Sequence, residues 1–322
     1  MAMELEKNGV NLFFLLSKAQ KILLVTHENP DGDAISSLGI CYDFLINSQK
    51  RTISFCKNLS GKHFDFLPYV EKIIDDKNEI DFASFDIAII LDCANLKRTG
   101  IDSELKSLQC PIINIDHHIS NNNFGYLNII DAQAVSTTQI LYELFKTAGV
   151  KITKNMANCI LTGIVTDSGN FAYTASSSQT FGIAGEMLMR GANVRDIINY
   201  TNKNKKLSTL KIWGLALSRL VYNKRYDIAY TVLTNEDLTE FGVVKDDLEG
   251  LSNFLNTLKD AKIVMVLYEL NDGRIKGSFR TTYANVDVSK LALRLGGGGH
   301  AKAAGFDVVG KLVYVDDKWQ II

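Results

Sequence analysis

The sequence predicts an α/β protein of two domains: an N-terminal domain with a doubly wound, mainly parallel sheet, and a smaller C-terminal α/β domain. Its 322 residues correspond to about two domains at roughly 150 residues each. In the first half, short apolar runs alternate with segments of helical length, and the alternation restarts after a long polar helical stretch. Continuous apolar runs are typical of strands buried on both faces, as in a parallel sheet covered by helices.

The elements of the first domain follow these runs in order. Residues 11–20 predict an amphipathic first helix rather than a signal peptide, because polar residues and no cleavage site follow the apolar run. Strands rich in Ile, Leu and Val are expected at 22–26, 52–56, 87–91 and 112–115. Helices are expected at 34–47, 136–148, 155–166 and 179–190. Strand–helix–strand alternation implies right-handed crossovers and therefore a doubly wound sheet.

The second half begins with a polar helical stretch, 194–222, which we interpret as a connector. Beyond it we expect strands at 227–234, 263–270 and 274–280, a helix at 286–295 and a last strand at 306–309. The predicted boundaries are 1–190 for the first domain, 191–225 for a helical linker and 226–322 for the second domain.

Composition narrows the class of protein. Lys and Arg total 35 against 36 Asp and Glu, whereas a protein that holds long duplex nucleic acid by charge alone is usually more basic; a local basic groove stays open. The five cysteines are scattered without a CxxC pair, which favours free thiols in a reducing compartment. No apolar run reaches the roughly 18 residues that span a bilayer. We therefore expect a cytoplasmic protein that does not bind membranes.

Acidic and imidazole side chains follow the predicted strands at their carboxyl ends, where open parallel sheets bind ligands. The segment HENPDGD, residues 27–33, follows the first strand and carries His27, Asp31 and Asp33 around a tight turn. Comparable positions after later strands and after the helix at 155–166 hold Asp92, Asp116, His117, His118 and Asp167. Each residue alone is an ordinary cap or turn former, but together they favour a metal site.

The residue types also indicate which ions such a site takes. Carboxylates and imidazoles without thiolates suit hard or borderline divalent ions such as Mn²⁺, Mg²⁺ or Co²⁺ rather than structural zinc. Crowded carboxylates without a cation would repel one another, and some would stay protonated. The residues therefore predict a two-metal site, with a solvated acidic turn as the alternative for the first motif.

The ordered motifs resemble those of the DHH phosphoesterase superfamily: HENPDGDA (27–34), ILDCAN (90–95), NIDHH (114–118) and GIVTDSG (163–169). KGSFRT (276–281) and GGGGHAKAAG (296–305) resemble the DHH-associated substrate-binding domain. The resemblance covers about residues 15–310, with all five motifs in order. Within the superfamily, the chain length and the GGGGH segment are similar to the bacterial oligoribonuclease (nanoRNase) and 3′-phosphoadenosine-5′-phosphate (pAp) phosphatase type.

The resemblance implies a role for each residue of the motifs. One of two divalent cations, Mn²⁺ ahead of Mg²⁺ or Co²⁺, would be held by His27 and Asp31. The other would be held by Asp33, His117 and Asp167, and Asp92 would bridge the two. His118 would face the substrate phosphate as a hydrogen-bond donor or general acid, and Asp116 would orient its neighbours.

The second domain would bind the end of the substrate. The N–H groups of a glycine run approach a phosphate closely, although such a run is otherwise a flexible turn. The residues expected to contact phosphate are Arg98, Arg280, Gly297, Gly298, Gly299 and His300. The active site would then lie in a cleft between the domains, while Arg98 could equally be a surface arginine.

The resemblance implies hydrolysis of short oligoribonucleotides of two to five nucleotides, including pGpG and pApA, to mononucleotides, and dephosphorylation of pAp. The alternatives are a cyclic-dinucleotide phosphodiesterase, an exopolyphosphatase or pyrophosphatase, and a non-catalytic nucleotide-binding protein. RNA against DNA preference stays open, as does the oligomeric state, with a homodimer as one alternative. Two features depart from the family pattern: Ser36 stands where Gly often follows the first motif, and the tail 311–322 lacks a long amphipathic helix.

Overall fold

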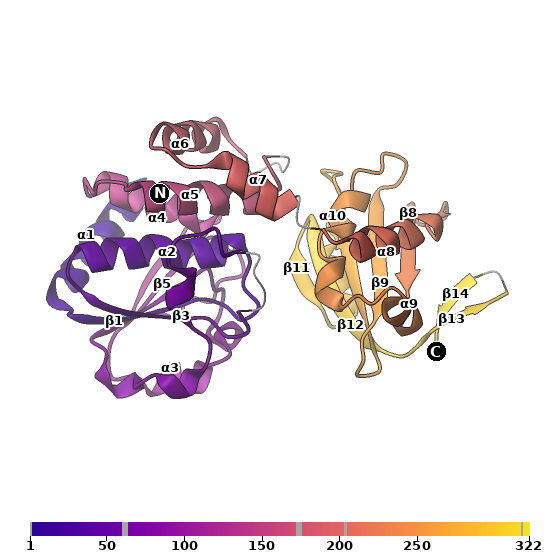
Figure 1. Ribbon diagram of the computed structural model, residues 1–322, viewed down its shortest axis with the longest axis horizontal. Coiled ribbons are helices and arrows are strands. Elements are labelled where there is room, and N and C mark those ends of the chain that lie inside the picture. Colours follow the sequence, from indigo (N-terminus) through magenta and orange to yellow (C-terminus); the bar gives the residue numbers. More distant parts are fainter. Residues whose placement is uncertain (1, 60–63, 172–175, 203–204, 317) are drawn as a thin grey trace. The chain divides into compact units, whose positions relative to one another are not determined.

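The protein divides into two compact units, Met1–Asn204 and Lys205–Ile322, and each is described by itself. The computed structural model describes residues 2–59, 64–171, 176–202, 205–316 and 318–322 (Figure 1). Within those ranges, no helix combines the length and apolar character that crossing a membrane requires.

The first unit is built on a six-stranded sheet in the order β3-β2-β1-β4-β5-β6, with every neighbouring pair parallel. Its strands are β1 (Lys21–Val25), β2 (Arg51–Phe55), β3 (Ile73–Ile74), β4 (Ile87–Leu91), β5 (Ile112–Asp116) and β6 (Leu127–Ile130). The predicted parallel sheet is confirmed, and the four expected strands are β1, β2, β4 and β5. The order places the carboxyl ends of β1, β4 and β5 next to one another.

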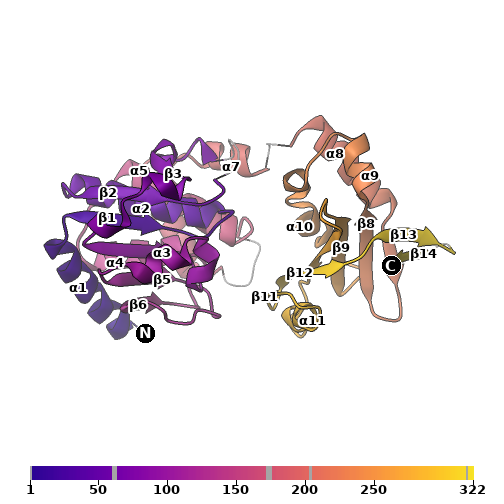
Figure 2. The ribbon, with the colours of Figure 1, turned by 90° about the horizontal axis from the view of Figure 1, so that it is seen from below.

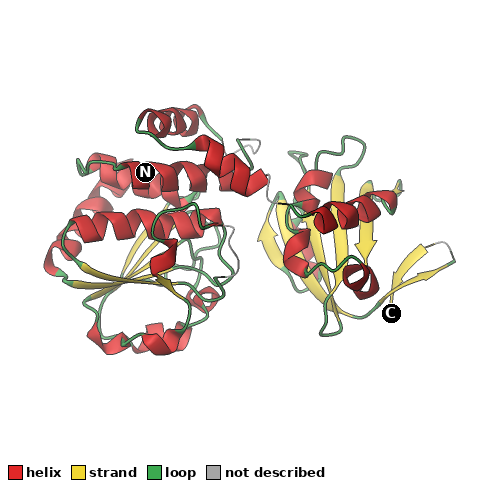
Figure 3. Cartoon of the chain, viewed as in Figure 1, coloured by secondary structure: helices red, strands yellow, loops and turns green. Residues whose placement is uncertain are grey.

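Helices cover both faces of this sheet (Figure 3). They are α1 (Ala2–Lys18), α2 (Gly32–Asn47), α3 (Asp102–Ser107), α4 (Thr137–Thr147), α5 (Lys154–Asp167), α6 (Ser178–Met189) and α7 (Val194–Asn202). Short 3-10 turns lie at Val70–Lys72, Lys77–Glu79, Phe82–Ser84 and Leu96–Thr99. The larger core packs β-strand residues against α1, α2, α4 and α5, and a smaller core lies under α3. Helices α2 and α5 approach closely because Gly39 has no Cβ, which would lie 2.9 Å from the Cys159 Sγ.

The second unit has its own six-stranded sheet, in the order β11-β12-β10-β9-β8-β7, in which only the β8–β9 pair is parallel. The strands are β7 (Val221–Asn223), β8 (Ile228–Leu233), β9 (Ile263–Glu269), β10 (Arg274–Arg280), β11 (Gly298–His300) and β12 (Ala303–Val309). The helices are α8 (Leu207–Ser218), α9 (Asn235–Glu240), α10 (Leu251–Leu255) and α11 (Ser289–Arg294), with a 3-10 turn at Lys245–Leu248. Helices α8, α9 and α10 cover one face of the sheet, and α11 packs on the other (Figure 2).

The stretch 194–222, interpreted above as a connector, contributes to both units. Helix α7 packs against α5 in the first unit, whereas α8 packs against β8 in the second. The apolar residues Ile212 and Ala216 of α8 are fully buried, because they belong to the core of the second unit.

The C-terminal tail forms a hairpin, β13 (Leu312–Val315) with β14 (Lys318–Ile321), beyond the strand expected to be the last (Figure 1). Leu312 is buried in the core on the α11 side of the sheet, and Trp319 packs against the same core. The Arg219 guanidinium lies 5.3 Å from the centre of the Trp319 ring. Alternating β-branched and aromatic residues favour strands here, which explains the lack of a C-terminal helix.

Candidate metal centre

Candidate ligands lie at the carboxyl ends of three neighbouring strands of the first sheet. His27 lies two residues beyond β1, Asp92 follows β4 directly, and Asp116 is the last residue of β5. Parallel strands in the order β1-β4-β5 end at the same edge, so residues far apart in the sequence meet there.

The loop after β1 is shaped by the start of α2. Asp31 is the N-cap of that helix, and its Oδ1 accepts a hydrogen bond from the Ala34 N–H at 3.0 Å. Its other oxygen, Oδ2, lies 3.8 Å from the His27 Nε2. The position between Asp31 and Asp33 requires a glycine, because a Cβ on Gly32 would lie 2.5 Å from the Thr166 side chain of α5. The turn therefore directs His27, Asp31 and Asp33 toward one region.

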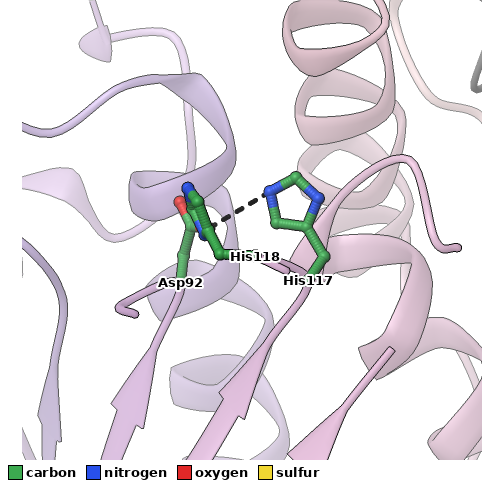
Figure 4. A group of neighbouring side chains, drawn as sticks. All are labelled: Asp92, His117 and His118. Atoms are coloured by element: carbon green, nitrogen blue, oxygen red, sulfur yellow. Dashed lines mark ion pairs between the residues drawn. The ribbon is translucent and has the colours of Figure 1, made fainter. Parts of the chain in front are cut away.

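Asp92 occupies the centre of the cluster and is 1% exposed. Its φ of 54° is left-handed, an uncommon conformation for a non-glycine residue, and its N–H donates to the Ile115 carbonyl at 3.0 Å. The Asp92 Oδ2 lies 3.6 Å from the His27 Nε2, while Oδ1 lies 3.6 Å from both the His117 Nε2 and the His118 Nδ1 (Figure 4). The two oxygens of one carboxylate thus face different imidazoles.

The structure brings all six predicted metal ligands together. Their ligand atoms form compact groups, within 4.8 Å of one another in each: His27, Asp31 and Asp92; Asp33, His117 and Asp167; and Asp92, His117 and His118. The first two groups correspond to the two predicted sites, and Asp92 is in contact with both through its imidazole neighbours. The arrangement fits divalent cations, since it offers oxygen and imidazole ligands at one place.

Burial and mutual repulsion raise the pKa values of two carboxyl groups in the cluster. Burial, together with the charge of Asp92, raises the pKa of Asp33 to about 7, and burial with the charge of Asp33 raises the pKa of Asp167 well above its usual range. Burial also opposes the ionisation of Asp92, but hydrogen bonding and charge from His27 and His117 outweigh it and lower the pKa of that carboxyl. A cation held among these groups would offset the repulsion between their carboxylates.

Asp116 orients the two histidines that follow it. It is fully buried, and its Oδ1 accepts hydrogen bonds from the His118 Nδ1 at 2.7 Å and from the His117 backbone N–H at 2.9 Å. The Asn121 Nδ2 donates to the Asp116 Oδ2 at 2.6 Å, which fixes the carboxylate from the other side. The orienting role expected for Asp116 is consistent with these contacts. The sequence analysis missed Asn121, whose only signal was its position in the polar run 121–123.

Two basic residues lie on segments that are hydrogen-bonded to the loop after β1. The Arg98 carbonyl accepts from the Glu28 N–H at 2.7 Å. The positive charge of Arg98 partly offsets the rise in the pKa of His27 that Asp92 and Asp31 cause. The Lys57 carbonyl accepts from the Asn29 N–H at 3.2 Å, and its Nζ lies 3.4 Å from the Glu28 carboxylate. Arg98 was predicted from the sequence, whereas Lys57 was not.

Of the five predicted phosphate-binding residues of the second unit, four lie on strands of its sheet, and Gly297 directly precedes β11. The residues Gly298, Gly299 and His300 form β11, which pairs with β12. An added Cβ at Gly297 would lie 2.1 Å from the Gly305 carbonyl oxygen, so close strand packing is one reason for the glycines. Arg280 ends β10, and its Nε donates to the Asn253 Oδ1 at 2.7 Å. Their contact with phosphate stays a prediction.

A parallel sheet whose strand ends gather carboxylates and imidazoles around a shared aspartate is the architecture of a metal-dependent hydrolase. The family models agree with this class: residues 21–164 match the DHH family, N-terminal domain, and residues 226–312 match the DHHA1 domain. The chain therefore belongs to the DHH family and is a phosphoesterase, with a C-terminal DHHA1 domain.

Two related proteins are similar in sequence to about nine-tenths of this chain. The bifunctional oligoribonuclease and PAP phosphatase NrnA of Thermus thermophilus is 29% identical over 90% of this chain and 84% of its own. The protein of the same name from Bacillus subtilis is 24% identical over 91% of each chain. Among solved structures, an exopolyphosphatase-related protein from Bacteroides fragilis has a TM-score of 0.89 and 28% identity, covering 95% of this chain and 92% of its own.

Binding of a divalent ion should release protons, and its apparent affinity should rise with pH up to about 9. Burial opposes a charge on His27, but Asp92 and Asp31 outweigh it and raise its pKa to about 9, and the pKa of Asp33 is raised to about 7. Protons therefore compete with the ion below these values, and the competition weakens as pH rises through them. Calorimetric titration with Mn²⁺ in two buffers of different ionisation enthalpy measures the released protons. An affinity that stays constant from pH 6 to 9 would contradict this assignment of the cluster.

Proposed function

We propose that the protein is a two-metal phosphodiesterase that cleaves short oligoribonucleotides, linear dinucleotides included, to mononucleotides and that also dephosphorylates pAp. The observation that carries the proposal is the pair of ligand groups that meet at Asp92. Two relatives are named for oligoribonuclease and PAP phosphatase activity, and they match about nine-tenths of this chain. Their names support the choice of substrates.

Each group of ligands would hold one ion. His27 and Asp31 would bind the first, Asp33, His117 and Asp167 the second, and Asp92 both; the oxygen-rich set favours Mn²⁺, with Mg²⁺ or Co²⁺ as alternatives. When bound, two such ions lower the pKa of a water molecule and neutralise the phosphoryl oxygens.

The chain's own side chains would position the phosphate and move the proton. Asp116 orients the His118 ring through Nδ1 at 2.7 Å, and the imidazolium form of His118 would donate to a phosphoryl or leaving oxygen. Arg98, near His27, would contact a phosphate through charge-assisted hydrogen bonds. In the second unit, the residues proposed to bind the chain end are Arg280, Gly297, Gly298, Gly299 and His300.

A polyphosphate substrate is the second candidate. The Bacteroides fragilis structure described as exopolyphosphatase-related is similar over nearly the full length of both chains. A cyclic-dinucleotide phosphodiesterase is supported less, because the Geobacillus thermodenitrificans enzyme of that activity is 23% identical and this chain covers only 44% of it. A non-catalytic role is disfavoured since every candidate ligand position is retained.

A substrate panel with Mn²⁺ tests these alternatives. We expect turnover of pGpG, pApA, pAp and two- to five-nucleotide RNAs, much slower cleavage of a twenty-nucleotide RNA, and little release of phosphate from polyphosphate or pyrophosphate. Exhaustive chelation should abolish activity, and added Mn²⁺ should restore it, because the ions would activate the water molecule and neutralise the phosphoryl oxygens. Polyphosphate as the fastest substrate, or activity that survives chelation, would overturn the proposal.

We also propose a cytoplasmic location. It is supported by the five cysteines, all of which are free thiols, four of them buried.

A further inference from the structure

Thr137, which the motifs do not include, contacts a carboxylate of each ligand group. It is the first residue of α4, directly after the N-cap Ser136, whose hydroxyl accepts from the Gln139 N–H at 3.1 Å. The first N–H groups of a helix have no partner within the helix. Here the Thr137 N–H donates to the Asp33 Oδ2 at 2.7 Å, and the Thr138 N–H donates to the Asp33 Oδ1 at 3.1 Å.

The side chain of Thr137 reaches the other central carboxylate. Its hydroxyl donates to the Asp92 Oδ1 at 3.1 Å, so one residue contacts both Asp33 and Asp92. Thr137 and Asp33 are 0% exposed and Asp92 is 1% exposed, which excludes water as a ready replacement for the hydroxyl. The other side-chain contacts of Asp92 are imidazoles, on its Oδ2 from His27 and on its Oδ1 from His117 and His118.

We propose that Thr137 is a positioning residue whose hydroxyl holds the Asp92 carboxylate with one oxygen toward each ligand group. It thereby maintains the affinity with which Asp33, His117 and Asp167 bind their ion. The inference rests on the proposed two-metal function. The hydroxyl bond fixes Oδ1 on the side of His117 and leaves Oδ2 on the side of His27. Without the bond the Asp92 carboxylate rotates more freely. Its Oδ1 is then less often oriented toward the ion that Asp33, His117 and Asp167 would bind.

The test compares Thr137→Val with Thr137→Ser. Valine keeps the shape and the backbone N–H but removes the hydroxyl, whereas serine retains it. We expect Thr137→Val to bind one Mn²⁺ as the wild type does and the second about 10–100-fold more weakly, which is typical of the loss of a hydrogen bond to a ligand. Thr137→Ser should restore the second affinity. Calorimetry gives the two affinities, and electron paramagnetic resonance reports the coupled ion pair without any substrate.

Thr162→Val is the matched control, because Thr162 lies on α5, which packs against α4, and is equally buried. Its hydroxyl donates to the Asn158 carbonyl at 2.8 Å, a contact that involves no candidate ligand. This variant should lose stability in thermal unfolding yet bind both ions normally.

The outcomes separate this inference from the function on which it rests. If the wild type binds two ions and cleaves its substrates, but Thr137→Val also binds two ions with unchanged affinity, only the role of Thr137 is wrong. Equal weakening in Thr162→Val would show a general effect of stability and would also overturn the inference. If the wild type binds fewer than two ions, the proposed function fails together with the inference.

Discussion

Asp92→Ala should give a folded protein that has lost more than about 100-fold of its phosphodiesterase activity and no longer binds a pair of ions. Residues that only orient metal ligands cost about 10–100-fold when removed, and Asp92 faces both ligand groups directly. The fold should survive, because the charge of Asp92 raises the pKa of Asp33 and its removal relieves that repulsion. Activity at saturating Mn²⁺, ion stoichiometry and circular dichroism measure the three parts of the expectation.

Asp43→Asn is the matched control for this variant. Asp43 lies on α2, the helix that carries Asp33, and it is 1% exposed. It accepts hydrogen bonds from the Thr153 hydroxyl at 2.7 Å and from the Tyr69 hydroxyl, away from the ligand groups. Its loss should lower the melting temperature and leave Mn²⁺ binding unchanged. Wild-type turnover in Asp92→Ala would contradict the bridging role, whereas equal loss in both variants would indicate general destabilisation.

The sequence predicted those parts of the fold that depend on local pattern. Strand β4 is a continuous apolar run, β1 is apolar after its first residue, and β2 and β5 contain Ile or Phe among polar residues. Each of the four lies within one or two residues of its expected place. Strand β3 has only two residues and β6 only four, too short for a pattern to stand out. The tail was expected to lack a helix, but its hairpin was not predicted, since the pairing of Leu312 with Ile321 depends on contacts rather than on periodicity.

The site was predictable to the extent that strand ends in a parallel sheet point to one edge. The rule located His27, Asp92 and His117 without the sheet order, and the motifs supplied their roles by resemblance. Thr137 could not be found in this way, because its hydrogen bond to Asp92 joins residues 45 positions apart. In addition, a threonine at the start of a predicted helix is typical of an ordinary cap. The close packing of Gly297 on β12 was likewise not predicted. A glycine run in a sequence is consistent both with close strand packing and with an anion site.

Arg280→Ala and His300→Ala should lower kcat/KM for dinucleotides by about 10–150-fold, chiefly through KM. This is the effect of losing a charged hydrogen bond to phosphate, on the order of 1.5–3 kcal/mol. In the proposal these residues bind the end of the substrate, while the ligand groups of the first unit cleave it. A small chromogenic phosphodiester without a second nucleotide should therefore be affected much less. Steady-state kinetics on both substrates measure the difference.

Arg274→Ala supplies the control on the same strand. Arg274 begins β10 and is paired with Asp272 and Asp307, whereas Arg280 ends that strand and donates to Asn253. Its removal should leave both substrates unaffected, because an exposed ion pair contributes little to stability. Equal loss of activity on the dinucleotide and the chromogenic substrate in Arg280→Ala would show that Arg280 serves the chemical step. Equal rates on dinucleotides and twenty-nucleotide RNA in the wild type would instead favour an exonuclease of long chains.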